Sequence, residues 1–279
     1  MARAERKSAT CQPMRKTAAA EERIRMDLSK RLTAVASLVT AGYTVADIGT
    51  DHAYIPISLV ERGTVPGAVA MDVNRGPLER AAENIRSHGL EGKIRTRLSD
   101  GFSALECGEA DSAVIAGMGG GLTIRILKEG AAVVSTLKEC ILQPQSEIEK
   151  VRAFLLEEGF LFIREDMVEE DGKYYPMMKV KPPRKGEEAP ENPGDRQESC
   201  RASWSETELR YGRLLLESRH PVLREYLLRE IKIKEQILSE LEEKASDRAE
   251  KRIMELKEEL EYAGKGMDYY AVQRDYTGD

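Results

Sequence analysis

Short apolar runs alternate with helical patterns through the first part of the chain. Helical spacing of apolar positions marks Asp27–Ala41, Leu78–His88 and Leu122–Lys128. The apolar runs with the length of buried strands are Val45–Gly49, Ala68–Val73, Ile94–Leu98, Ser112–Met118 and Cys140–Pro144. Continuous apolar strands separated by helices are typical of a parallel sheet with helices on both faces. The pattern therefore predicts a doubly wound α/β domain.

The alternation changes after a predicted helix at Ile148–Glu158. Phe160–Glu169 and Tyr174–Val180 are both strand-like, and only Glu170-Asp171-Gly172-Lys173 separates them. Asp-Gly between two strand patterns is a strong signal for a hairpin. We therefore expect a mostly parallel sheet that ends in an antiparallel hairpin.

The last part of the chain is strongly helical. Ser205-Glu206-Thr207-Glu208 matches a capping box and predicts a helix start. Apolar positions then recur at heptad-like spacing from Pro221 to Tyr262, with an interruption near Ser246. Two helices folded back as an antiparallel coiled-coil hairpin fit this pattern best. The alternative is one long helix with a stutter, through which the chain could dimerise.

These patterns predict five consecutive segments. They are a leader (1–22), an α/β domain (23–181), a linker (182–204), a helical coiled-coil domain (205–262) and a loose tail (263–279). The linker is assigned by composition, because it is rich in proline and charge and poor in apolar residues.

Composition narrows the class of protein. The 279 residues are 41% hydrophobic and 33% charged, which is typical of a soluble globular chain. No apolar run approaches the length of a membrane span, and the basic N-terminus lacks a signal-peptide apolar region. The four scattered cysteines predict a reducing cytoplasm and neither a disulfide framework nor a metal site. We expect no membrane partner, and the pattern is compatible with a monomer.

The end of the first predicted strand carries an acid–glycine motif, Asp47-Ile48-Gly49-Thr50-Asp51. Gly49 permits a tight turn against a bound nucleoside, because no Cβ intervenes. Asp51 and Tyr54 stand where a dinucleotide fingerprint has its second and third glycines, so a pyrophosphate-binding loop is absent. Acids at this turn suit a ligand with an ammonium and a sulfonium, and S-adenosylmethionine presents both. Solvated acids at an ordinary turn are the alternative interpretation.

The next two predicted strands also end in acids. Asp72-Val73 lies roughly 20 residues beyond the first turn, where a carboxylate accepts hydrogen bonds from ribose hydroxyls. Asp100-Gly101 follows the third strand, where a carboxylate can accept from an adenine amine. In an open α/β sheet the ligand crevice lies outside the carboxyl ends of the strands. Three consecutive acids there predict a nucleoside-binding site.

The fourth and fifth predicted strands add a glycine-rich turn and an amide. Gly117-Met118-Gly119 precedes a predicted helix, and its glycines would let a substrate approach the backbone closely. Gln143 ends the fifth strand, where it would read a base edge or cap the next helix.

Taken together, these motifs resemble one family. The segments that carry the resemblance are Leu28–Leu32, Ala46–Pro56, Gly76-Pro77, Ile115–Gly120, Leu142–Pro144 and Glu169–Lys173. Over about residues 24–262 the chain is similar to TrmK, the bacterial tRNA (adenine-N1)-methyltransferases that act on the adenine at position 22. The resemblance implies a Rossmann-like class I methyltransferase fold with a C-terminal helical coiled coil, S-adenosylmethionine as cofactor and tRNA as partner. The charged linker and the leader depart from the family pattern.

The resemblance also suggests roles for particular residues. We expect Asp47, Gly49, Asp51, Asp72, Val73, Asp100, Gly101, Gly117, Met118 and Gly119 around the cofactor. We expect Asp51, His52 and Tyr54 to be the catalytic residues, with Asp51 as the acid nearest the reacting base and with His52 and Tyr54 holding that base. Lys30, Arg31 and Gln143 are expected to contact the substrate. The alternatives are a methyltransferase acting on another RNA or on a small molecule, and a non-catalytic nucleoside-binding scaffold whose coiled coil recruits a partner.

The formal net charge of −6 argues mildly against broad nucleic-acid binding, but a local basic surface decides such binding. We expect that surface at Arg23, Arg25, Lys30, Arg31, Arg75 and Arg80. Within the helical segment, the candidate RNA-binding cations are Arg210, Arg213, Arg219 and Lys234.

Overall fold

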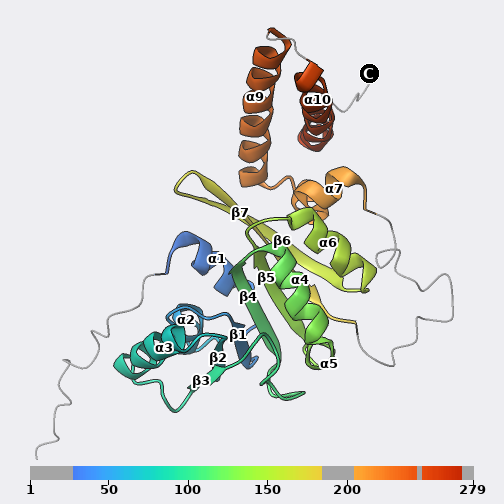
Figure 1. The fold of residues 1–279 in the computed structure, drawn as a ribbon. Helices are drawn as coiled ribbons and strands as arrows, with labels where there is room; N and C mark the ends of the chain where they lie inside the picture. The colour runs from blue at the N-terminus through green and yellow to red at the C-terminus, as the bar shows by residue number, and fades with distance from the viewer. Residues whose placement is uncertain (1–27, 184–203, 244–246, 272–279) are drawn as a thin grey trace, which may run out of the picture.

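A computed structural model describes residues 28–183, 204–243 and 247–271, without the side chains of 247–249. The predicted leader, most of the predicted linker and the predicted turn at Ser246 lie outside these residues. Among the described residues, a seven-stranded sheet has the order β3-β2-β1-β4-β5-β7-β6 (Figure 1). Its strands are β1 (Val45–Ile48), β2 (Ala68–Asp72), β3 (Ile94–Leu98), β4 (Ser112–Met118), β5 (Glu139–Pro144), β6 (Leu161–Glu170) and β7 (Lys173–Lys181).

The sheet is parallel except for β7, which pairs antiparallel with both β5 and β6. The expected α/β fold with a terminal hairpin is therefore confirmed. β3 is less buried than predicted: Ile94 is buried, whereas Arg95, Thr96 and Leu98 of this edge strand are exposed. An edge strand can present polar side chains to water without burying them.

Helices cover both faces of the sheet. Ile57 of α2 (Tyr54–Glu61) and Ile85 of α3 (Arg75–Ser87) join one buried cluster, together with residues of α1 (Lys30–Ser37). Ile126 of α4 (Gly120–Glu129) and Phe154 of α6 (Ile148–Glu157) join the cluster on the opposite face, next to the short α5 (Ala131–Val134). The first helix is shorter than the predicted Asp27–Ala41, since Ser29 caps it and it ends at Ser37.

The helical region packs directly on the sheet. α7 (Glu206–Tyr211) and α8 (Arg213–Glu217) lie against β6 and α6. Arg152 of α6 and Glu165 of β6 form a fully buried ion pair at 2.8 Å. Arg152 also donates to two carbonyls of α7, and Glu165 accepts the backbone N–H of Leu214. Removing the helices would leave this buried pair without those partners, which is costly.

Gly212, between α7 and α8, is required by this junction. Its φ is +91°, and a Cβ there would lie 2.6 Å from Glu165 Oε1 and 2.7 Å from Arg152 Nη2. Any other residue would displace the buried pair, so the junction between sheet and helices depends on a glycine.

α9 (Pro221–Glu243) and α10 (Asp247–Asp268) form an antiparallel pair. Lys234 of α9 contacts Glu259 of α10 at 2.8 Å, and Lys257 of α10 contacts Glu242 of α9 at 2.9 Å. The predicted helical hairpin, rather than one long helix, is therefore the observed arrangement. The predicted loose tail from residue 263 is wrong over its first part. α10 continues to Asp268 and Ala263 is fully buried, because the tail packs on Tyr211 and Leu227.

Candidate functional site

The carboxyl ends of β1 and β4 form the switch point of the sheet. β1 pairs with β2 on one side and with β4 on the other, and the helices that follow β1 and β4 pack on opposite faces. Ligands of doubly wound sheets bind in the crevice that this reversal opens. The predicted acids and glycines lie at or just beyond the carboxyl ends of β1, β2, β3 and β4.

The turn after β1 has an unusual backbone. Gly49 has a φ of +75°, and a Cβ there would overlap the Met118 side chain. His52 and Ala53 also have positive φ, at 61° and 56°, immediately before α2. Two consecutive non-glycine residues in this region store strain, and such strain is common at ligand sites. A hydrogen bond of 3.0 Å from Asn84 to the His52 carbonyl holds the turn in place.

Asp47 is a buried acid beneath this turn. Its side chain lies at the end of β1, and the residue is only 6% exposed. Burial, together with the nearby Asp72 carboxylate, raises the pKa of Asp47 to about 6, although the Thr50 side chain acts in the opposite direction. Burial and Asp72 both disfavour the ionised form of Asp47, so a cationic group beside it would stabilise the carboxylate. The site therefore fits the ammonium or sulfonium of S-adenosylmethionine.

Asp72 and Asp100 occupy the ends of β2 and β3 as predicted. Asp72 Oδ1 accepts the Asn74 backbone N–H at 2.7 Å. Asp100 forms an exposed ion pair with Arg125 at 3.2 Å. Val73 is 57% exposed at the same edge, where an apolar side chain can cover the face of a nucleoside. A carboxylate and an exposed apolar side chain thus lie on adjacent residues, Asp72 and Val73.

The structure brings Asp51, His52 and Tyr54 together at the start of α2. The His52 and Tyr54 rings stack at 5.0 Å with an interplanar angle of 11°. Asp51 is 3.1 Å from Arg80 and 3.4 Å from His52 Nε2. The Asp51 carboxylate is therefore already partnered by Arg80, a contact that the sequence did not reveal. The stacked rings form a short aromatic platform beside the turn.

The glycine turn at the end of β4, Gly117-Met118-Gly119, lies close to α1 and to the loop after β5. Gly117 has a φ of +81° and lies at a register shift in the pairing of β4 with β5. Its missing Cβ would be 3.6 Å from Arg31 Nη1 and 3.7 Å from Gln145 Nε2. Gly119 then caps α4. The absence of a Cβ at Gly117 leaves room for a substrate atom between β4 and these polar side chains.

Gln143 makes internal contacts that the sequence did not predict. Its side chain is fully buried, accepts from Arg31 Nη1 at 2.9 Å and donates to the Pro144 carbonyl at 3.1 Å. Its amide oxygen and nitrogen thus each have a partner inside the protein, and the contact with the substrate stays a prediction. Gln143 orients Arg31, whose guanidinium also lies 5.6 Å from the centre of the Tyr175 ring.

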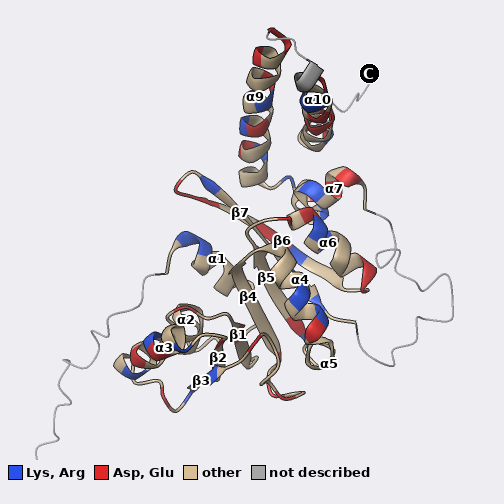
Figure 2. Ribbon diagram, in the orientation of Figure 1, with Lys and Arg blue, Asp and Glu red and all other residues tan. Residues whose placement is uncertain are grey.

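The predicted basic surface is divided. Arg23 and Arg25 lie outside the described residues. Lys30 and Arg31 lie on α1, whereas Arg75 and Arg80 lie on α3 (Figure 2). Among the helical candidates, Arg213 contacts Glu208 and Glu217, and Lys234 contacts Glu230 and Glu259. The charge of these two side chains is already neutralised by carboxylates.

Neither a metal site nor a membrane helix is found in the part of the chain that the structure describes. No group of three or more His, Cys, Asp or Glu side chains there could hold a metal ion. No helix in that part is long and apolar enough to cross a membrane.

Comparisons with known proteins agree with this geometry. Residues 28–178 match a family model described as a methyltransferase domain. The tRNA (adenine(22)-N(1))-methyltransferase of Bacillus subtilis (strain 168) is 39% identical over 153 residues, which are 55% of this chain and 64% of that protein. The chain thus spans just under two thirds of that relative in this comparison.

Two solved structures extend the similarity to the helical region. The B. subtilis m1A22 tRNA methyltransferase TrmK is 28% identical, with a TM-score of 0.72 over 87% of this chain and 99% of that one. Streptococcus pneumoniae Sp1610, solved in complex with S-adenosyl-L-methionine, is 31% identical, with a TM-score of 0.69 over 86% of this chain and 100% of that one.

Fold, strand-end acids and family model together define the class of the protein, a Rossmann-like methyltransferase. Within this class, the chain belongs to the TrmK family.

Proposed function

We propose that this protein transfers a methyl group from S-adenosylmethionine to N1 of the adenine at position 22 of tRNA, in the cytoplasm. The observation that carries the proposal is the set of acids and glycines at the switch point of the sheet. Asp47, Asp72 and Asp100 lie at the carboxyl ends of three neighbouring parallel strands. Gly49 follows β1, and Gly117 lies near the end of β4, the strand on the other side of β1. The names of the related proteins supply the substrate.

The cofactor half of the site is acidic. Asp47 is buried, and the pKa of its carboxyl is raised in the ligand-free protein. A bound cation would lower this pKa again, because it stabilises the ionised carboxylate. Asp72 stands where a ribose is held in doubly wound folds, and Val73 is exposed beside it. Bound S-adenosylmethionine would supply an electrophilic methyl group on a sulfonium.

The chemistry at adenine N1 asks for positioning more than for a base. This nitrogen already carries a lone pair, so no proton has to leave before attack. The ring becomes cationic on methylation. We assign the Asp51 carboxylate to stabilise that positive charge. His52 and Tyr54 would support the base by stacking, which requires the adenine to leave its own stack in the tRNA.

An assay of the full chain tests this proposal. An unmodified tRNA transcript is incubated with the protein and S-adenosylmethionine, digested to nucleosides and analysed by mass spectrometry. We expect 1-methyladenosine at up to one equivalent per tRNA. A transcript with guanine at position 22 is the matched control and should gain none.

Two results would overturn the proposal. Methylation of both transcripts would show that another nucleotide is the target. Binding of S-adenosylmethionine without transfer to any RNA would favour a nucleoside-binding scaffold.

A further inference from the structure

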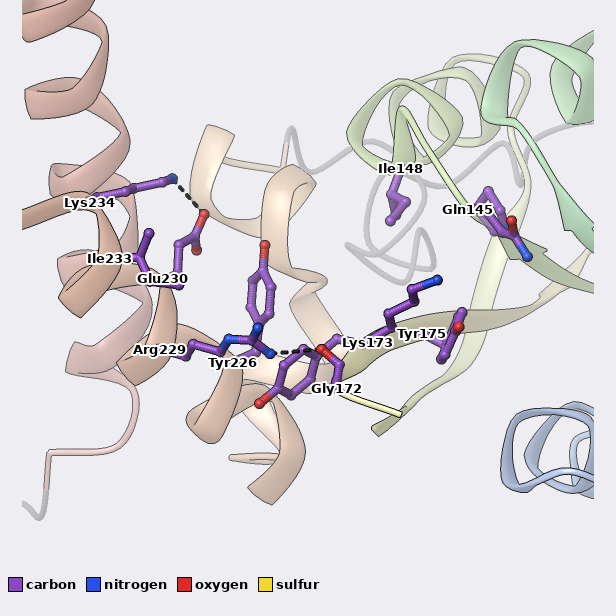
Figure 3. A pocket seen from close by; sticks show the side chains of 12 residues that line it. Gln145, Ile148, Gly172, Lys173, Tyr175, Tyr226, Arg229, Glu230, Ile233 and Lys234 are labelled. Carbon is purple, nitrogen blue, oxygen red and sulfur yellow. Dashed lines mark hydrogen bonds and ion pairs between the residues drawn. The ribbon is translucent and has the colours of Figure 1, made fainter. Parts of the chain in front are cut away.

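A cavity lies between the sheet and the helical hairpin formed by α9 and α10, apart from the expected cofactor residues. It has a volume of about 600 Å³ and is walled by the loop after β5, the start of β7 and one face of α9. Figure 3 shows Lys173, Tyr175, Tyr226 and Arg229 around this space. The volume lies in the range of small-ligand sites. None of the expected cofactor residues lines it.

The cavity has an excess of positive charge. Glu230 is its carboxylate, and this group is paired with Lys234 at 2.6 Å. Arg229 donates to the Gly172 carbonyl at 2.8 Å, which leaves its positive charge uncompensated by that contact. Lys173 is exposed at the start of β7 and extends into the space near Tyr175 (Figure 3). Lys173 and Arg229 are therefore available to an anion.

Aromatic rings line the same space. Tyr174 and Tyr226 meet edge to face at 5.2 Å, and Arg229 lies 5.7 Å from the centre of the Tyr174 ring. Cations interleaved with aromatic faces are the combination by which proteins hold unstacked nucleotides of single-stranded RNA. A purely structural contact between sheet and helices would not need two cations facing an open cavity.

One wall of the cavity continues into the candidate methyl-transfer site. Gln145 lines the cavity, and its backbone N–H donates to the Met118 carbonyl at 2.8 Å. Its side-chain nitrogen lies 3.7 Å from the position that a Gly117 Cβ would occupy. A strand of RNA with one base at Gly117 can therefore place an adjoining nucleotide in the cavity.

We propose that this cavity binds one unstacked nucleotide of the RNA substrate next to the methylated adenine, with its phosphate at Lys173 and Arg229 and its base against the tyrosine rings. The inference rests on the proposed function for the identity of the substrate. It adds a recognition site formed jointly by the sheet and by α9, which explains why the helical hairpin is held on the sheet.

Binding of unmodified tRNA to the full chain, titrated against salt, tests the charged part. The variant is Lys173→Gln/Arg229→Gln, and the matched control is Arg224→Gln/Lys232→Gln, which removes two exposed cations of α9 outside the cavity. We expect the cavity variant to lower the slope of log affinity against log salt by about 1. The control should keep the slope of the unaltered protein, and both variants should bind S-adenosylmethionine normally.

A second pair of variants tests the aromatic part. Tyr174→Leu should weaken tRNA binding roughly tenfold by removing a stacking face, and Tyr174→Phe should retain it. Thermal unfolding of both variants checks that they fold. Equal loss in the Leu and Phe variants would show that the hydroxyl matters rather than the ring, and no loss in the Leu variant would show that the ring is not needed; either result would overturn the stacking site.

The outcomes separate this inference from the proposed function. If the cavity and control variants bind tRNA equally, the cavity proposal is wrong even when the unaltered protein methylates tRNA. If the cavity variant alone loses affinity, the proposal holds, and the separate methylation assay decides the reaction.

Discussion

The two halves of the carboxyl edge of the sheet differ in charge and in side-chain type. The acidic half, at the ends of β1, β2 and β3, carries Asp47, Asp51, Asp72 and Asp100. The aromatic-basic half, at β5, β7, α1 and α9, carries Arg31, Lys173, Tyr174, Tyr175 and Arg229. The glycine turn after β4 lies between them.

The difference shows how a chain of net charge −6 can serve a polyanionic substrate. In the proposed function the cationic cofactor lies on the acidic half, where RNA phosphates would be repelled. We propose that the RNA phosphates lie along the other half and that only the reacting adenine reaches the turn after β1, because local charge governs such binding more than the net charge does. Changes at the cofactor acids Asp47 and Asp72 should therefore weaken cofactor binding and spare the contacts to RNA phosphates, and changes at Lys173 and Arg229 should do the reverse.

The largest expected effect is at Asp47. Its pKa in the folded protein is about 6, above the ordinary value of 3.8. The stability that comes from protonated Asp47 is fully present below pH 3.8 and is lost as the pH rises through about 6. Asp47→Asn should therefore stabilise the ligand-free protein at pH 7.5, by as much as about 3 kcal/mol, and should change little at pH 4. Denaturant unfolding at the two pH values measures this.

The same change should weaken cofactor binding. Affinity of the unaltered protein for S-adenosylmethionine should rise between pH 5 and pH 7 as Asp47 ionises, and Asp47→Asn should abolish that rise. An Asn variant with an unchanged pH dependence would remove Asp47 from the cofactor site.

Asp72 should have the next largest effect. Asp72→Ala should weaken S-adenosylmethionine binding roughly tenfold or more, because hydrogen bonds to a charged acceptor are worth about 1.5–3 kcal/mol. Asp72→Asn keeps an acceptor for the Asn74 backbone and should lose less. Glu91→Ala, an exposed acid before β3 at the other end of the sheet, is the control. Calorimetry that shows equal affinities for all three would contradict the assignment.

A smaller effect is expected at Arg31 in the aromatic-basic half. Arg31→Lys cannot both donate to Gln143 and lie flat over Tyr175, because a lysine has no planar fork. The KM for tRNA should rise severalfold while the affinity for S-adenosylmethionine stays constant. Arg86→Lys, exposed at the far end of α3, should behave as the unaltered protein. A change in cofactor affinity instead would place Arg31 in the acidic half.

The smallest expected effect is at Arg80. Its ion pair with Asp51 is solvent-exposed on both sides, and such pairs contribute about 0–1 kcal/mol. Arg80→Gln should therefore shift the unfolding midpoint only slightly and change methylation less than twofold. A large loss of activity would show that Arg80 orients Asp51 for the reaction.

Strand periodicity and strand-end residues predicted the fold because buried parallel strands leave a continuous apolar signal. β4 matches its predicted bounds, and the Asp-Gly turn of the hairpin lies where expected. The acids at β1, β2 and β3 were predictable for the same reason, since parallel strands present their carboxyl ends at one edge.

The rest depended on contacts between residues distant in sequence. Nothing in the sequence around Gln143 indicated that Arg31, 112 residues earlier, would donate a hydrogen bond to its amide oxygen. The Arg152–Glu165 pair and the packing of Ala263 likewise arise from helices that return to the sheet. The cavity between the sheet and α9 was not predictable, because Tyr174 and Arg229 meet only once α9 lies beside β7.

Binding of both ligands to two variants of the full chain tests the division of the edge most directly. Dissociation constants for S-adenosylmethionine and for unmodified tRNA are measured with Asp72→Asn and with Lys173→Gln/Arg229→Gln. We predict that the first variant loses affinity only for the cofactor and the second only for the tRNA. Loss of both ligands in either folded variant, or loss of the opposite ligand, would contradict the division.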